Sequence, residues 1–99
     1  MGRSIYTPEH EILASLLRDV RLQSGLRQVD VAEAMRRSQS FVSDYESGQR
    51  RLDLVELRML CQVLGTTLPR LVQRYERLIN EYQQQKKRPA KKGASRRNR

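Results

Sequence analysis

The chain contains one cysteine and one histidine among its 99 residues, and this scarcity limits the chemistry it could perform. Cys61 alone cannot form an internal disulfide bond, which is consistent with a reducing cytoplasm. His10 lies far from Cys61 in sequence, so the two provide neither metal-ligand spacing nor a catalytic constellation. We therefore expect a protein that is not an enzyme and holds no metal ion and no cofactor, with His10 on an exposed helix face.

Long hydrophobic runs are also missing. No apolar stretch approaches the roughly 20 residues that span a membrane. The first residues, MGRSIYTPEHE, lack the apolar core of a signal peptide, and Tyr6 stands where the N-myristoylation pattern needs Ser or Thr. These absences predict a cytoplasmic protein without membrane contact.

Acidic residues are absent from the end of the chain. Residues 86–99 hold eight of the twenty basic residues and none of the eleven acidic ones, so residues 1–85 carry twelve basic against eleven acidic side chains. This tail has no apolar residue larger than alanine or proline, and we expect it to be disordered. Because the formal charge of +9 lies mostly in the tail, the remainder must bind any polyanion by the placement of its charges.

Glycine and proline divide the chain into short helical segments, and nothing in it is typical of a strand. Thr7 and Pro8 form a helix start, because a capping hydroxyl precedes a proline whose fixed φ suits the first turn. Three further helices are expected over about 28–36, over 38–48 with Ser38 as its cap, and over 53–65. The last of these begins with a capping box of Asp53 and Glu56 and carries Cys61 on an apolar stripe, where we expect it to pack in the core.

A fifth helix is predicted from about Pro69 to Gln85. Its apolar residues recur at helical spacing and continue past the expected end of the domain, which favours a partner helix, although the same stripe could be intramolecular core. The candidate dimer-interface residues are Tyr75, Leu78, Ile79 and Tyr82.

The segment QVDVAEAMRRSQSFVSDYES, residues 28–47, has the spacing of two helices that cross at a tight turn. Such a crossing needs a small residue, here Ala32, and inward apolar residues, here Val31, Met35, Val42 and Tyr45. Together with LRQVDVA, the Ser-x-Val-Ser-x-Tyr-Glu-x-Gly element and a later Leu-Gly, the segment resembles the phage-repressor (XRE or Cro-like) helix-turn-helix family. The resemblance covers roughly residues 12–78.

The resemblance implies an all-α, five-helix, lambda-repressor-like domain. It implies a helix-turn-helix domain over residues 1–68 with its motif at 28–47. The periodicity and composition described above add an extended C-terminal helix over 69–85 that serves dimerisation and the disordered basic tail over 86–99. It also implies that Gln28 contacts a phosphate and supports Gln39, and that Arg21 and Glu46 form a structural pair between the first and third helices.

The third predicted helix exposes amides and hydroxyls, which both donate and accept hydrogen bonds. The resemblance assigns base reading to its outward residues Gln39, Ser40, Ser43 and Asp44, although a solvated helix face is the alternative. A glutamine amide can pair with both N6 and N7 of adenine. Asp44 either repels the DNA backbone or accepts a bond from a cytosine amine. The candidate phosphate contacts are Arg27, Gln28, Arg50 and Arg51.

Two residues depart from the family pattern. Arg36 stands where the turn carries glycine, so either the turn differs or Arg36 takes a positive φ at a cost of about 1 kcal/mol. Arg27 replaces the Ser or Thr cap, which loses capping but places a cation near a phosphate.

These observations predict a transcriptional regulator that binds double-stranded DNA. In this class, two recognition helices about 34 Å apart read a palindrome, so we expect a homodimeric repressor from a bacterium or phage. The alternative is an antitoxin, whose last helix and tail would bind a protein toxin while the helix-turn-helix regulates its own operon.

Overall fold

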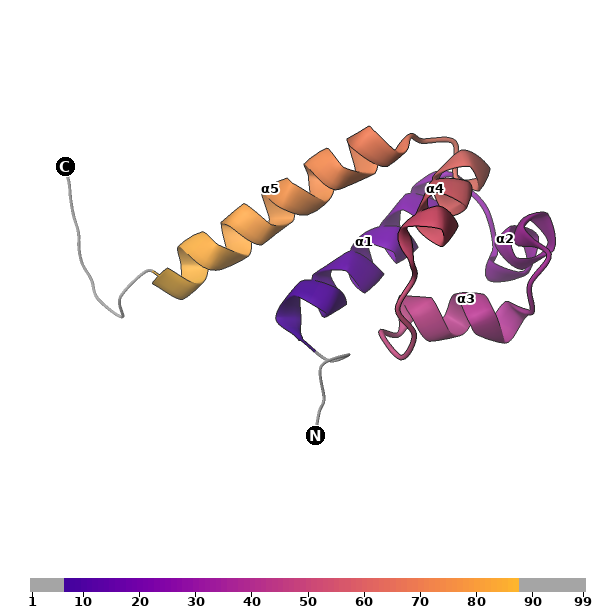
Figure 1. Cartoon of the computed structure of the whole chain (residues 1–99), viewed down its shortest axis with the longest axis horizontal. Coiled ribbons are helices and arrows are strands. Elements are labelled where there is room, and N and C mark those ends of the chain that lie inside the picture. The colour runs from indigo at the N-terminus through magenta and orange to yellow at the C-terminus, as the bar shows by residue number, and fades with distance from the viewer. Residues whose placement is uncertain (1–6, 88–99) are drawn as a thin grey trace.

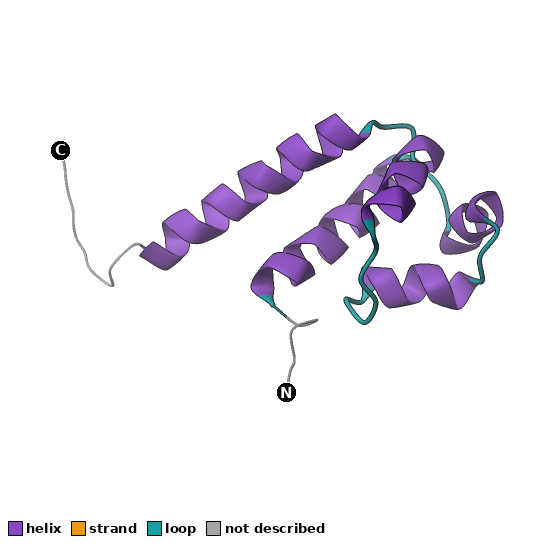
Figure 2. Ribbon diagram, in the orientation of Figure 1, coloured by secondary structure: helices purple, strands orange, loops and turns teal. Residues whose placement is uncertain are grey.

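The computed structural model describes residues 7–87, and all of the regular structure within this range is helical (Figures 1 and 2). Five helices follow one another with short connections: α1 (Pro8–Gln23), α2 (Gln28–Met35), α3 (Gln39–Glu46), α4 (Leu54–Val63) and α5 (Leu68–Lys87). The predicted five-helix, all-α fold is therefore confirmed. Residues 1–6 and 88–99 lie outside the described range, so most of the predicted basic tail is not part of this description.

Side-chain caps begin three of the helices as the sequence predicts. The Oγ1 atom of Thr7 accepts a backbone N–H in the first turn of α1 at 3.1 Å, and Oγ of Ser38 does the same for α3 at 3.3 Å. The capping box of α4 is complete, since Asp53 accepts the backbone N–H of Glu56 at 2.7 Å and Glu56 accepts that of Asp53 at 2.9 Å. These bonds satisfy N–H groups that have no partner within the helix.

The turn between α2 and α3 keeps the left-handed geometry although it lacks glycine. Arg36 has φ 58° and ψ 43°, and the N–H of Arg37 donates to the carbonyl of Ala32 at 2.9 Å. The alternative expectation, a turn of different shape, is therefore wrong. A residue with a side chain is strained in this left-handed conformation, and for Arg36 the strain costs about 1 kcal/mol.

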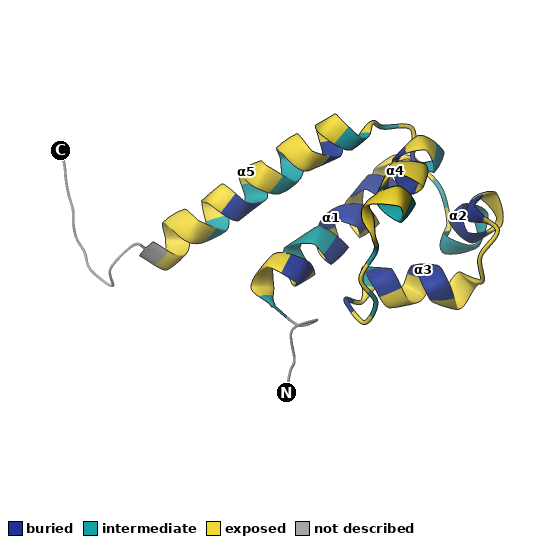
Figure 3. Cartoon of the chain, in the orientation of Figure 1, coloured by how far each residue is buried: buried dark blue, intermediate teal, exposed yellow. Residues whose placement is uncertain are grey.

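The core lies where α1, α2, α3 and α4 meet, and α5 closes it (Figure 3). Ala32 is buried at the crossing of α2 and α3, as the sequence predicts. Cys61 is buried as well, and its burial raises the pKa of the thiol, which agrees with the predicted packing role. The buried cluster comprises Leu16, Leu17, Val20, Val31, Ala32, Met35, Phe41, Val42, Tyr45, Leu60, Cys61, Leu64 and Leu71.

The apolar stripe of α5 packs against α1 of the same chain (Figure 1). Ile79 is only 8% exposed, and Tyr75 and Leu78 are partly buried against the core. The hydroxyl of Tyr75 also donates to the backbone carbonyl of Glu9 at 3.2 Å. The intramolecular alternative thus describes Tyr75, Leu78 and Ile79 within one chain, and their role in a dimer interface stays a prediction. Tyr82, near the end of α5, is half-buried.

His10 is buried, so the expectation of an exposed helix residue is wrong. Its Nε2 atom lies 3.0 Å from the backbone carbonyl of Gly48, to which it donates. Gly48 follows α3 with φ +84°, and the loop after α3 covers the first turn of α1. Because 38 residues separate the two partners, no local sequence pattern predicts this contact.

Candidate nucleic-acid interface

One face of α3 is polar and exposed, while the opposite face is buried (Figure 3). Helical geometry produces this division, since the buried residues Phe41, Val42 and Tyr45 recur at helical spacing and turn the remaining positions outward. All four predicted base-reading residues lie on the exposed face: Gln39, Ser40, Ser43 and Asp44. The arrangement offers amide, hydroxyl and carboxylate groups on the exposed face of α3.

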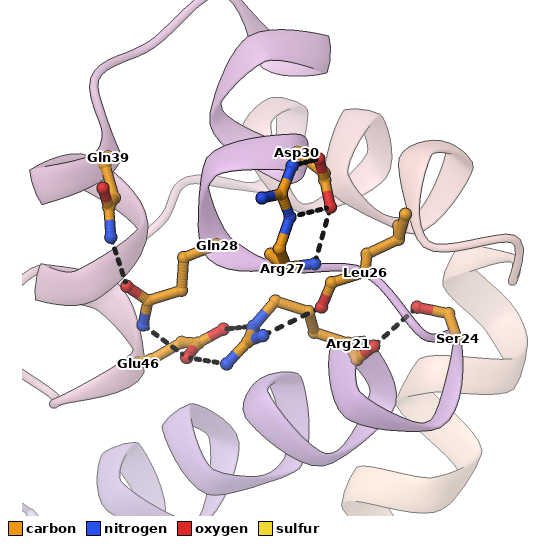
Figure 4. Close-up of polar contacts among 8 residues, drawn as sticks. All are labelled: Arg21, Ser24, Leu26, Arg27, Gln28, Asp30, Gln39 and Glu46. Atoms are coloured by element: carbon orange, nitrogen blue, oxygen red, sulfur yellow. Dashed lines mark hydrogen bonds and ion pairs between the residues drawn. The ribbon is translucent and has the colours of Figure 1, made fainter.

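A chain of hydrogen bonds joins the exposed face of α3 to the interior (Figure 4). Nε2 of Gln39 donates to Oε1 of Gln28 in a long bond of 3.4 Å. Nε2 of Gln28 donates in turn to Oε1 of Glu46 at 3.0 Å. Because the carboxylate can only accept, it fixes which end of the Gln28 amide points at Gln39. The support of Gln39 by Gln28, implied by the family resemblance, is therefore present in the geometry.

Arg21 and Glu46 form the ion pair that the resemblance implies, between α1 and α3. The guanidinium is bidentate, with Nε 2.6 Å from Oε2 and Nη2 3.1 Å from Oε1 of the carboxylate. Nη1 also donates to the backbone carbonyl of Leu26 at 2.9 Å. The hydrogen bond to Glu46 raises the pKa of Arg21. This pair anchors the connection before α2 as well as α3.

Arg27 is exposed at the start of α2 and does not cap the helix with its own side chain. Asp30 acts in its place, since its carboxylate accepts the backbone N–H of Arg27 at 2.9 Å. The guanidinium of Arg27 lies 2.9 Å from the same carboxylate, and these bonds lower the pKa of Asp30 to about 2. A phosphate contact by Arg27 would therefore compete with a charged partner on its own helix.

On the other side of α3, Arg50 belongs to a cluster that the sequence did not reveal. Its Nη2 atom lies 2.8 Å from Oε2 of Glu56, and Nη1 of Arg37 lies 3.2 Å from the same oxygen. Both guanidinium groups stack on the ring of Phe41. The capping-box spacing identified Glu56, but nothing in the sequence indicated that two arginines would meet it. Arg51 is exposed in the same loop.

Residues 7–87 contain no cluster of three His, Cys, Asp or Glu residues with the geometry to hold a metal ion. Over the same range, the helices are too short or too polar to cross a membrane.

Comparisons with known proteins agree with this architecture. A sequence profile described as a helix-turn-helix domain matches residues 12–75. Among curated proteins, none matches the chain. An XRE-family like protein from Pseudomonas syringae pv. tomato str. DC3000 is 34% identical, with 71% of this chain and 85% of that one covered and a TM-score of 0.66. The clp gene regulator ClgR from C. glutamicum is 26% identical, covers 71% and 90%, and has a TM-score of 0.65.

A further similar structure extends the fold comparison. The restriction-modification controller protein C.Esp1396I, as a tetramer in complex with its natural 35 base-pair operator, is 17% identical, covers 72% of this chain and 93% of its own, and has a TM-score of 0.66. At this identity the likeness concerns the fold alone. The profile match, the 34% identical relative and the described geometry together establish that the chain belongs to the XRE family of helix-turn-helix transcription regulators.

Proposed function

We propose that the protein is a sequence-specific DNA-binding regulator that acts as a homodimer on a palindromic operator, with α3 in the major groove. The observation that carries the proposal is the exposed polar face of α3, whose residue Gln39 is oriented by Gln28. The amide nitrogen of Gln39 has two N–H donors, so it can contact Gln28 and adenine N7 together, while its oxygen accepts from adenine N6. Repression follows if the operator overlaps a promoter.

A homodimer needs an apolar surface, and α4 offers one. Leu54 and Val55 are 65% and 69% exposed, and Met59, one turn along, is 45% exposed. Three of the four candidate residues of α5, Tyr75, Leu78 and Ile79, pack against the core of their own chain, so we propose a dimer interface on α4. Neighbouring exposed apolar side chains such as these are typical of surfaces that associate. In this class, the two subunits of a dimer present their recognition helices to successive turns of the major groove.

Selection of bound sites from random DNA tests the proposal. Full-length protein should enrich a palindrome whose half-sites are about one helical turn apart. Gln39→Ala should change the enriched bases within each half-site. Enrichment of no sequence, with binding that depends only on charge, would contradict specific recognition.

A second candidate is the interaction protein of the antitoxin type, and one feature favours it. An open groove of about 470 Å³ lies between α1 and the end of α5, with Ile12, Leu16, Leu78 and Tyr82 among its apolar lining residues. A helix of a partner protein could bury the half-exposed side chains of Ile12, Leu78 and Tyr82. Purification from the native host distinguishes the two functions. A second polypeptide that is retained by the wild type and lost with Ile12→Asp would support this candidate, whereas a pure homodimer would support the first.

A further inference from the structure

Two arginines share one carboxylate oxygen beside the recognition helix. Nη1 of Arg37 and Nη2 of Arg50 lie 3.2 and 2.8 Å from Oε2 of Glu56. Their guanidinium carbons lie 3.9 and 4.9 Å from the centroid of the Phe41 ring. Two cations held together by one anion leave a local charge of +1. One oxygen between two guanidinium groups is also the arrangement that binds a phosphate oxygen.

The cluster lies on the flank of α3 that is opposite to Gln28. Phe41 and Glu46 stand at the two edges of the buried face of α3, because five residues advance about 140° around a helix. Gln28 contacts Glu46 at one edge, and the two arginines stack on Phe41 at the other. The exposed face, which carries Gln39 and Ser43, lies between these edges.

A helix in the major groove has a phosphate backbone on each side. Gln28 lies at one edge of α3, where it contacts Glu46, and so on the side of one of these backbones. We propose that Arg37 and Arg50 form a phosphate-binding pair for the other backbone, and that the Glu56 carboxylate is the internal counter-ion of this pair in the free protein. The inference rests on the proposed DNA-binding function and adds Arg37 and Glu56 to the residues that control it.

The exposure of the cluster fits this role. The side chains of Arg37 and Arg50 are each 39% exposed, so DNA can approach both guanidinium groups, whereas Glu56 is 16% exposed and lies behind them. Over residues 7–87 the buried Nε–H of Arg50 meets no acceptor, so donors exceed acceptors in the cluster. An incoming phosphate adds acceptors for the exposed N–H groups of the two guanidinium groups, which Glu56 alone does not satisfy.

Glu56→Gln separates this role from helix capping. In the wild type, Oε1 of Glu56 accepts the backbone N–H of Asp53, and Oε2 receives the arginines. A glutamine keeps the capping oxygen but turns an NH₂ group toward the two cations. The variant should therefore be less stable when free. Its arginines, which then lack an internal anion, should bind phosphate more tightly.

The experiment measures binding of the full chain to a selected duplex and a random duplex across a salt series. Arg37→Ala should weaken binding to both duplexes about fivefold, which corresponds to the attraction between two unit charges about 4 Å apart in water. It should also make the slope of log affinity against log salt shallower by about 0.9. Glu56→Gln should strengthen binding to both about fivefold. In the Arg37→Ala/Arg50→Ala background, Glu56→Gln should have no such effect.

Arg77→Ala and Glu76→Gln, both exposed on α5, are the controls of matched charge. If Arg37→Ala and Glu56→Gln have the same affinities and salt slopes as these controls, the inference is overturned. The proposed function still stands in that case, because the wild type binds DNA. Wild-type protein that binds no duplex would overturn both. If circular dichroism shows that Glu56→Gln does not fold, the comparison of Arg37→Ala with Arg77→Ala tests the inference instead. An Arg37→Ala variant that binds DNA as tightly as Arg77→Ala would overturn the phosphate-binding pair.

Discussion

Nε of Arg21 lies 2.6 Å from Oε2 of Glu46, across the contact between α1 and α3, with the two side chains only 9% and 4% exposed. The same carboxylate also accepts from Gln28, which contacts Gln39 on the exposed face. A buried ion pair therefore stands at the base of the hydrogen-bond chain that orients a predicted base-reading residue.

Removing one member of this pair should cost more stability than removing both. Arg21→Ala leaves the Glu46 carboxylate buried without its cation, and we expect a loss of about 3 kcal/mol in the free energy of unfolding. The double variant with Glu46→Ala should be more stable than either single variant. Urea denaturation of the wild type, the two single variants and the double variant gives the coupling free energy of the pair. Small losses that add up in the double variant would mean that the pair behaves like a surface ion pair.

The exposed pair of Arg27 and Asp30 is the matched control for this cycle. It joins the same residue classes on a solvated surface, where screening and side-chain entropy leave little net stabilisation. Its cycle should show much weaker coupling than that of Arg21 and Glu46.

Gln39→Ala and Ser40→Ala should relax DNA specificity without unfolding the protein. Both side chains are exposed at the start of α3, so their removal leaves no cavity. Each should reduce affinity for the preferred site by about 1–3 kcal/mol and affinity for random DNA very little. Competition binding against random duplex measures the difference, and equal losses on both duplexes would show that these residues only position the protein.

Arg36→Gly should stabilise the protein by up to about 1 kcal/mol. Glycine adopts φ 58° without the steric cost that an arginine meets there, although it gains entropy in the unfolded chain. Thermal and urea unfolding report the change. An unchanged or lower stability would mean that the Arg36 side chain makes compensating contacts.

Val55→Asp should convert a dimer to a monomer with its fold intact. Val55 is 69% exposed on α4, so a charge there costs the free chain little but would be buried in the proposed interface. Val72→Asp is the control, because Val72 is 46% exposed on α5. Sedimentation velocity measures the state of each. If Val72→Asp is a monomer and Val55→Asp remains a dimer, the interface lies on α5 and not on α4.

Deletion of residues 88–99 should lower affinity for all DNA sequences alike. The segment adds six basic residues and no acidic one. If half of them neutralise phosphates, the slope of log affinity against log salt should become shallower by about 3. Specificity should be unchanged, because contacts to the phosphate backbone do not read bases. Coinciding slopes for the full and shortened chains would show that residues 88–99 do not contact DNA.

The sequence alone determined the helices, the helix-turn-helix and the polar face of α3. Caps such as Thr7, Ser38 and Asp53 act within one helical turn, and apolar periodicity acts within a few turns, so both are visible in the order of residues. The left-handed turn at Arg36 was also foreseen as one of two alternatives.

Only the tertiary structure decided what lies beside what. His10 meets Gly48 across 38 residues, Arg37 meets Glu56 across 19, and Tyr75 meets Glu9 across 66. The apolar stripe of α5 could not tell a helix of its own chain from a helix of a partner, because burial of apolar surface is not directional. Such contacts depend on how the packed helices cross, which no local pattern records.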